Sequence, residues 1–115
     1  MVVNKWAELS KLADMAFEMK SRKMSGLRSQ EDVIVLQRQA LSNMNTAAMD
    51  GFAGVHLAHQ MSGDFHWQEW VGGNMQRLGV QQAQVRARIE MLKPELRKAY
   101  GRKNALVELS ELKTR

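Results

Sequence analysis

The sequence predicts an all-α fold in which two long helices pair as an antiparallel coiled-coil hairpin. Good helix formers, chiefly Leu, Met, Ala, Gln, Glu, Lys and Arg, dominate the 115 residues, and Pro94 is the single proline. Apolar residues recur at spacings of three, four and seven in both halves of the chain, as in a heptad seam. Aromatic residues make up 6% and the mean hydropathy is −0.42, which favours a narrow seam over a broad globular core.

The first arm of the hairpin is expected to span about residues 3–60 of a single-domain chain of 115 residues. Ser25-Gly26 interrupts this arm, and Ser29 followed by Asp32 resembles a capping box, so a separate helix could begin at Ser29. One long helix with a local defect is favoured, because the apolar residues keep one register across the gap. The predicted seam residues of this arm are Leu27, Ile34, Leu41, Met44, Ala48, Val55 and Ala58.

The turn is predicted near residues 61–64. Ser62-Gly63-Asp64 combines a glycine that can end one helix with an aspartate that can cap the next. It also lies near the middle of the chain, which leaves two arms of similar length.

The second arm is expected over about residues 65–112. Gln82 and Lys103 occupy seam positions that apolar residues skip, and polar seam residues can fix the register of a coiled coil. Pro94 falls on the outer face, where it removes one backbone hydrogen bond and can kink the helix, but it does not by itself end the hairpin. The predicted apolar seam residues are Val71, Met75, Leu78, Val85, Ile89, Leu92, Leu96, Ala99 and Leu106.

Charge and composition favour a binding protein over an enzyme. The net charge is +5, and residues 76–115 hold 10 Lys/Arg against 4 Asp/Glu, so the excess positive charge lies there. Such a stretch suits an acidic protein surface, nucleic acid or anionic lipid, or is simply a solvated helix face. There is no Cys, and neither a nucleophile motif nor a phosphate-binding loop occurs. His56, His59 and His66 match no known zinc spacing, so neither catalysis nor a metal or other cofactor is expected.

An aromatic cluster, Phe65, Trp67 and Trp70, follows the predicted turn. A two-helix seam cannot fully bury three large aromatic side chains, so part of their surface is expected to mark an interaction site. Alternatively, these rings fold back over the small and aromatic residues Gly51, Phe52 and Gly54. The two readings are compatible.

The second arm opens with an aromatic-led run, Trp67-Gln68-Glu69-Trp70-Val71, and continues with Met75, Leu78, Gln82, Val85, Ala87-Arg88 and the basic stretch from Arg97 to Leu109. This pattern resembles the FliJ-type flagellar export proteins and their injectisome counterparts, the coiled-coil stalk family of type III secretion. Gly72-Gly73 and Pro94 depart from the family pattern.

The resemblance implies a non-enzymatic component of bacterial flagellum biogenesis or type III protein transport, in the cytoplasm and peripheral to the inner membrane. Its expected partners are a hexameric export ATPase, the membrane-embedded export gate and substrate chaperones. The residues expected to bind the ATPase lie at the end that carries both termini: Trp6, Leu9, Leu12, Arg97, Lys98, Arg102, Lys103, Leu106 and Leu109. Those expected to bind the gate or other partners are Trp67, Trp70, Val71, Met75, Leu78 and Gln82.

Two other functions remain open from the residues themselves. A basic coiled coil could bind nucleic acid, although Tyr100 is the only aromatic residue within its basic stretch. A generic adaptor could instead pair its arms between two chains.

Overall fold

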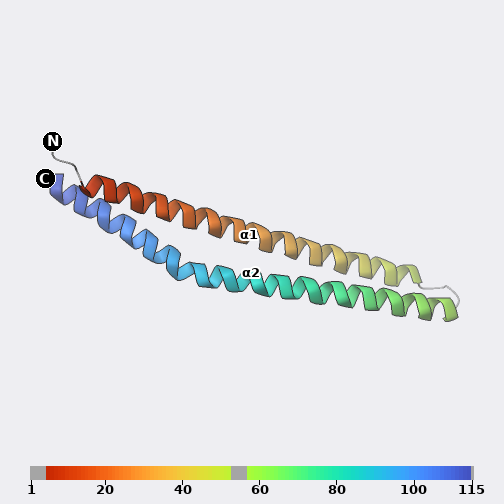
Figure 1. The fold of residues 1–115 in the computed structure, drawn as a ribbon. Coiled ribbons are helices and arrows are strands. Elements are labelled where there is room, and N and C mark those ends of the chain that lie inside the picture. Colours follow the sequence, from red (N-terminus) through yellow and green to blue (C-terminus); the bar gives the residue numbers. More distant parts are fainter. Residues whose placement is uncertain (1–4, 53–56, 115) are drawn as a thin grey trace. The chain divides into compact units, whose positions relative to one another are not determined.

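The computed structural model describes the backbone of residues 5–52 and 57–114, and the side chains of residues 5–50, 63 and 65–112. Helix α1 spans Lys5–Phe52 and helix α2 spans Leu57–Thr114 (Figure 1). Over these ranges the chain contains no strand. The predicted all-α hairpin is therefore confirmed.

Both helices are continuous through their weak points. Helix α1 passes through Ser25-Gly26 without interruption, and α2 passes through Pro94. The preference for one long first helix, rather than a new helix at Ser29, is confirmed. Pro94 is exposed, in agreement with its predicted place on the outer face, where the backbone carbonyl that loses its partner can bond to water.

Contacts divide the chain into two units, and each unit contains a stretch of both helices. Unit 1 consists of residues 1–28 and 87–115, and unit 2 consists of residues 29–86. In unit 1 the first residues of α1 lie beside the last residues of α2 (Figure 1). In unit 2 the rest of α1 lies beside the first half of α2.

The seam of unit 1 is narrow and apolar at its centre. Its buried side chains are Met24 and Leu27 from α1 and Ile89, Leu92 and Ala99 from α2. Burial of apolar surface in this seam is the main stabilising term, because isolated helices gain little from their backbone hydrogen bonds in water.

The seam of unit 2 combines apolar and polar side chains. The buried ones are Ile34 and Leu41 from α1 and Val71, Leu78, Gln82 and Val85 from α2. Three contacts fix the direction of pairing, because the residue numbers on α2 fall as those on α1 rise: Glu31 with Arg86, Arg38 with Gln82, and Asn45 with Trp67. The pairing is therefore antiparallel.

The predicted turn at residues 61–64 is wrong, because these residues lie inside α2. Helix α1 ends at Phe52 and helix α2 begins at Leu57. The cross-helix contacts agree with these helix bounds: the midpoints along the chain of Asn45–Trp67, Glu31–Arg86 and Arg38–Gln82 fall between residues 56 and 60, before the predicted turn. Tertiary pairing has thus overridden a favourable local turn sequence. Residues 53–56, which include the predicted seam residue Val55, lie outside the described part of the chain, and so does the side chain of Ala58.

Candidate protein-binding surfaces

Unit 1 contains all nine residues expected to bind an ATPase. On α1, Leu9 and Leu12 are exposed and Trp6 is half-buried. On α2, the exposed members are Arg97, Lys98, Arg102 and Leu109, whereas Lys103 and Leu106 are half-buried. The set therefore presents apolar side chains and cations from both helices of one unit.

Lys103 differs from the other cations of this set because it is held against α1. Its ammonium forms an ion pair with Asp14 at 3.0 Å and lies 4.8 Å from the centre of the Phe17 ring. The Phe17 ring also packs against Tyr100, with ring centres 5.6 Å apart. Cation–π and aromatic contacts of this kind each contribute on the order of 0.5–1 kcal/mol. Lys103 therefore stabilises the pairing of the two helices as well as adding positive charge.

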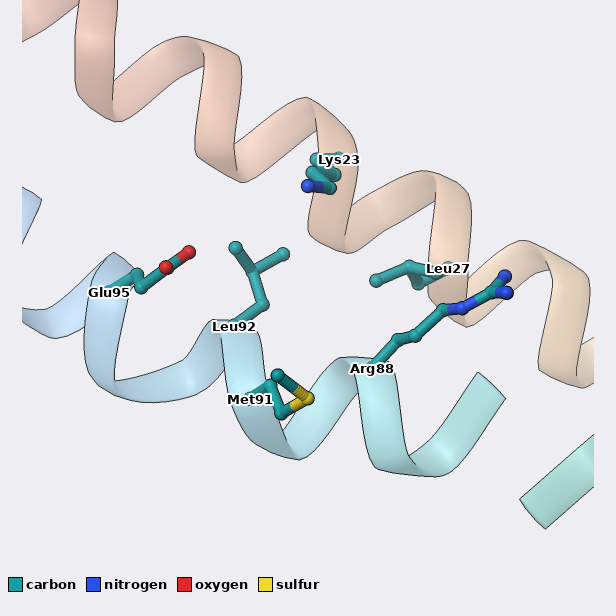
Figure 2. Close-up of a pocket in the computed structure, with 6 residues that line it drawn as sticks. All are labelled: Lys23, Leu27, Arg88, Met91, Leu92 and Glu95. Atoms are coloured by element: carbon teal, nitrogen blue, oxygen red, sulfur yellow. The ribbon is translucent and has the colours of Figure 1, made fainter. Parts of the chain in front are cut away.

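A groove of about 470 Å³ lies between the two helices of unit 1 (Figure 2). Leu27 and Leu92 form its apolar floor, and the thioether of Met91 lies on its rim. Lys23 from α1 and Arg88 from α2 add two cations, and Glu95 adds one anion at the other end. Leu27 and Leu92 were predicted as seam residues, but the groove itself was not predicted, since a groove depends on how two helices pair and not on the residue spacing of either one.

Unit 2 divides the residues expected to bind the gate into two groups. Val71, Leu78 and Gln82 are buried in the seam. Trp70 is 50% exposed, and Trp67 and Met75 are half-buried. A partner can therefore reach the second group on the intact hairpin, but it can reach the first group only if the helices separate.

The aromatic cluster in unit 2 is partly buried and partly exposed. Trp67 donates its indole N–H to Asn45 Oδ1, and its ring lies 5.3 Å from that of Trp70. Phe65 remains 66% exposed and touches His66 edge-on. The predicted exposure of part of the cluster is confirmed. The alternative contact with Phe52 and Gly54 lies outside the described side chains.

A second groove, of about 360 Å³, runs beside Trp70 in unit 2. Met44 and Leu41 contribute apolar surface from α1, and Arg77 contributes the one cation of its lining. Asn74 accepts a hydrogen bond from Arg77 at 3.1 Å and donates one to the Trp70 carbonyl at 2.8 Å. The Arg77 guanidinium is thereby held at the groove.

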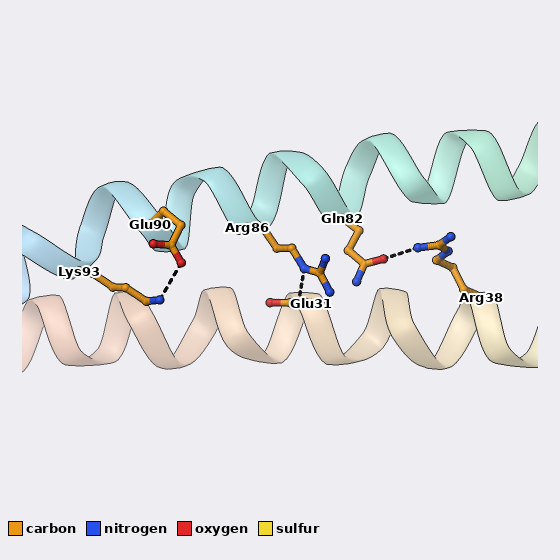
Figure 3. A network of polar contacts seen from close by, with 6 residues as sticks. All are labelled: Glu31, Arg38, Gln82, Arg86, Glu90 and Lys93. Atoms are coloured by element: carbon orange, nitrogen blue, oxygen red, sulfur yellow. Dashed lines mark hydrogen bonds and ion pairs between the residues drawn. The ribbon is translucent and has the colours of Figure 1, made fainter.

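Figure 3 shows two of the polar contacts that cross the seam of unit 2. Arg38 donates to the buried amide oxygen of Gln82 at 2.6 Å. Arg86 donates to Glu31 at 2.8 Å, and this pair is partly exposed. Polar contacts at seam positions specify register, because any slip leaves the buried group without a partner. The predicted seam position of Gln82 is confirmed.

In unit 1, Glu90 and Lys93 form a contact within α2 (Figure 3). The Lys93 ammonium donates a hydrogen bond to the Glu90 carboxylate at 2.6 Å. This hydrogen bond lowers the pKa of Glu90 below its usual value, and the charges of Lys93 and Arg97 act in the same direction. Both side chains are exposed enough that the pair is solvated.

Positive charge is concentrated in unit 1. In the sequence, residues 1–28 and 87–115 carry 14 Lys/Arg and 7 Asp/Glu, a net +7. Residues 29–86 carry 3 Lys/Arg and 5 Asp/Glu, a net −2. The first arm, which looked neutral along the sequence, thus contributes cations to the same unit as the basic end of the second arm.

Among the described residues, no group of three or more His, Cys, Asp or Glu side chains is placed to hold a metal ion. Neither described helix contains a stretch long and apolar enough to cross a membrane. Of the three histidines, His66 is exposed, while His56 and the side chain of His59 lie outside the described residues.

The chain matches no protein-family model, and no curated protein sequence and no solved structure is significantly similar to it.

Proposed function

We propose that the protein is a non-enzymatic coiled-coil component of a flagellar or type III protein export apparatus, and that unit 1 binds the export ATPase. The observation that supports this proposal is the net charge of +7 in unit 1, where exposed cations of α2 adjoin exposed leucines of α1. The export gate and substrate chaperones are the further partners that the family resemblance implies.

An antiparallel hairpin suits this role for a physical reason. The two helix ends of unit 1 are already paired, so binding requires little further ordering of the backbone. Exposed Arg and Lys side chains accelerate the encounter with an acidic surface, and the apolar side chains contribute affinity once water is excluded. The ATPase surface that receives this unit is accordingly expected to be acidic, with apolar patches.

The proposed contact with the gate uses the exposed side of unit 2. Trp70, with the neighbouring half-buried Trp67 and Met75, offers the large apolar side chains that often dominate binding energy. Val71, Leu78 and Gln82 would support these residues from within the seam.

Charge reversal in unit 1 tests the proposal. Arg97→Glu with Arg102→Glu should weaken binding to the purified export ATPase by tenfold or more, and binding of the unchanged protein should weaken as salt rises. The matched control is Arg28→Glu with Arg88→Glu, which reverses two exposed arginines of the same unit outside the predicted set. Equal affinity of all three proteins for the ATPase would contradict the proposal.

The same concentration of charge supports nucleic-acid binding as a second candidate function. Each phosphate contact lowers the logarithm of affinity by about 0.9 per logarithm of salt concentration. Fluorescence anisotropy with a labelled duplex would detect such binding. The slope of log affinity against log salt concentration should then correspond to several phosphate contacts, and the Arg97→Glu/Arg102→Glu variant should have a smaller slope. This result would favour nucleic acid over the export ATPase as the partner.

A further inference from the structure

We propose that the outer face of α1 in unit 1 is a self-association surface, which binds the same face of a second copy of the chain in antiparallel orientation. This pairing would leave the α1–α2 seam of each chain intact. It therefore differs from an adaptor whose arms pair between chains.

The surface is an apolar stripe that no described side chain covers. It consists of four large side chains, with exposed fractions of 46% for Leu9, 61% for Leu12, 54% for Met15 and 71% for Met19. Their spacings of three, three and four residues place them on one face of the helix. Leu12, Met15 and Met19 point away from the seam residues Met24 and Leu27, whereas Leu9 borders the seam. Contiguous apolar surface of this kind marks an interaction site on a soluble helix.

The charges along the stripe are complementary to themselves when the stripe is reversed. Glu8 and Arg22 lie seven residues before and after Met15, and Lys11 and Glu18 lie four before and three after it. A two-fold axis at Met15 therefore sets Glu8 opposite Arg22 of the second copy, and places Glu18 of the second copy one residue from the position opposite Lys11. A parallel arrangement would instead set like charges against each other.

The existing contacts leave these charges available. Glu18 and Arg22 form an ion pair within α1 at 3.7 Å, between side chains that are 58% and 84% exposed. Such a solvated pair contributes less than about 1 kcal/mol and exchanges readily for a contact between chains.

The local charge favours a second copy over an acidic partner. Glu8, Lys11, Glu18 and Arg22 together carry no net charge, and residues 5–23 as a whole carry five Lys/Arg against three Asp/Glu, a net +2 of the +7 of unit 1. An acidic protein is drawn to the cations of α2, whereas the charges beside the stripe are closer to balance and are self-complementary. Three turns of one helix offer less than the ~800 Å² per partner of a standard interface, so the dimer should be weak and concentration-dependent.

Sedimentation equilibrium of the full chain tests the proposal, at loading concentrations from about 1 to 200 μM, a range that brackets weak dimers. The unchanged protein should show a monomer–dimer equilibrium. Lys11→Glu and Glu18→Lys should each weaken it about tenfold, and the double variant should restore it, because the opposed charges are then exchanged. Lys98→Glu, which makes the same charge change as Lys11→Glu on α2, should have no such effect.

A monomer at the highest concentration would overturn the proposal. A double variant that dimerises no better than the single variants would overturn the antiparallel arrangement. Circular dichroism of each variant checks that helix content is unchanged.

Cross-linking supplies a second, independent readout. The chain contains no cysteine, so Met15→Cys introduces a single thiol at the proposed axis. A short bismaleimide should link two Met15→Cys chains faster than two Met91→Cys chains, whose new thiol is also exposed but lies on α2. Equal rates of cross-linking would contradict the proposed axis.

Leu9 and Leu12 also belong to the set expected to bind the ATPase. Self-association and ATPase binding should therefore exclude each other. The proposed dimer does not depend on the proposed function, because sedimentation and cross-linking of the purified chain involve no other protein.

Discussion

Gln82 shows how one side chain can set the register of a two-helix seam. It is 5% exposed, and its amide oxygen accepts a hydrogen bond from Arg38 across the seam. A slip of α1 along α2 would leave this buried amide without its partner, at a cost of about 1–3 kcal/mol. An apolar residue in its place would bury more favourably but would specify the register less strictly.

Gln82→Ala should lower the free energy of unfolding by about 1–2 kcal/mol, since it removes a buried contact to a charged group and leaves a cavity. Urea denaturation measures this change. Combined with Arg38→Ala, it should give a coupling energy of about 1 kcal/mol. Gln84→Ala, at an exposed position two residues away, should change stability by less than about 0.5 kcal/mol. Purely additive effects of Gln82→Ala and Arg38→Ala would contradict the assigned contact.

Glu90 supports a prediction about pH. The pKa of its carboxyl is lowered chiefly by the hydrogen bond from Lys93, so the contact stabilises the fold above the carboxyl's unfolded pKa and loses this effect as pH falls through the folded pKa. Lys93→Met should raise the pKa of Glu90 towards its ordinary value of 4.5. Titration of the side-chain carboxyl by NMR measures it. A pKa of Glu90 that is the same in both proteins would contradict the contact.

Individual seam residues were only partly predictable from the sequence. Leu27, Ile34, Leu41 and most of the α2 ladder are buried as predicted, but Met44 is half-exposed. Met24 was missed. Met24 belongs to a row of seam positions spaced seven residues apart, and in unit 2 this row continues with the polar residues Glu31, Arg38 and Asn45. A search for apolar residues therefore missed this row, and it selected Met44 in place of Asn45.

At the scale of the helix, glycine residues weaken both arms. Gly26 lies inside α1 and Gly101 inside α2, both exposed, and a Cβ atom added at either one meets no atom within 4 Å. Glycine in a helix interior costs about 0.5–1 kcal/mol relative to alanine, because the unfolded chain loses more freedom on folding.

Gly26→Ala and Gly101→Ala should each raise the free energy of unfolding by about 0.5–1 kcal/mol, and the two gains should add because the sites share no contact. Thermal and urea unfolding followed by circular dichroism would measure them. Destabilisation by Gly26→Ala would show that α1 is not continuous at Ser25-Gly26.

The position of the turn between the two helices was not predicted correctly from the sequence. Ser62-Gly63-Asp64 carries suitable turn residues, yet it lies within α2. Turn chemistry is a local preference of about 1 kcal/mol, whereas a shift of the turn would change every cross-helix contact in both units. The register contacts, such as Trp67 with Asn45, involve residues 22 positions apart and cannot be read from a local motif.

At the scale of the whole molecule, the pairing of the helices places cations from both ends of the sequence in one unit. Cations such as Lys23 and Arg28 precede the middle of the chain, residues 29–86 with a net charge of −2, yet they belong to the same unit as Arg97 and Arg102. The fold class and the basic character of the second arm were predictable from spacing and composition. The grooves, the collection of cations in unit 1 and the exposure of the self-complementary stripe could not be predicted without knowing how the two helices pair.

The central claim is that this hairpin acts by binding the proteins of an export apparatus. Affinity capture with the tagged full chain from its native cells, at moderate salt and after nuclease treatment, tests this claim most directly when the bound proteins are identified by mass spectrometry. The account predicts an export ATPase or a gate protein among them, and the loss of the ATPase with Arg97→Glu/Arg102→Glu. Capture of neither protein, together with the loss of all other bound material on nuclease treatment, would contradict the claim and favour nucleic acid as the partner.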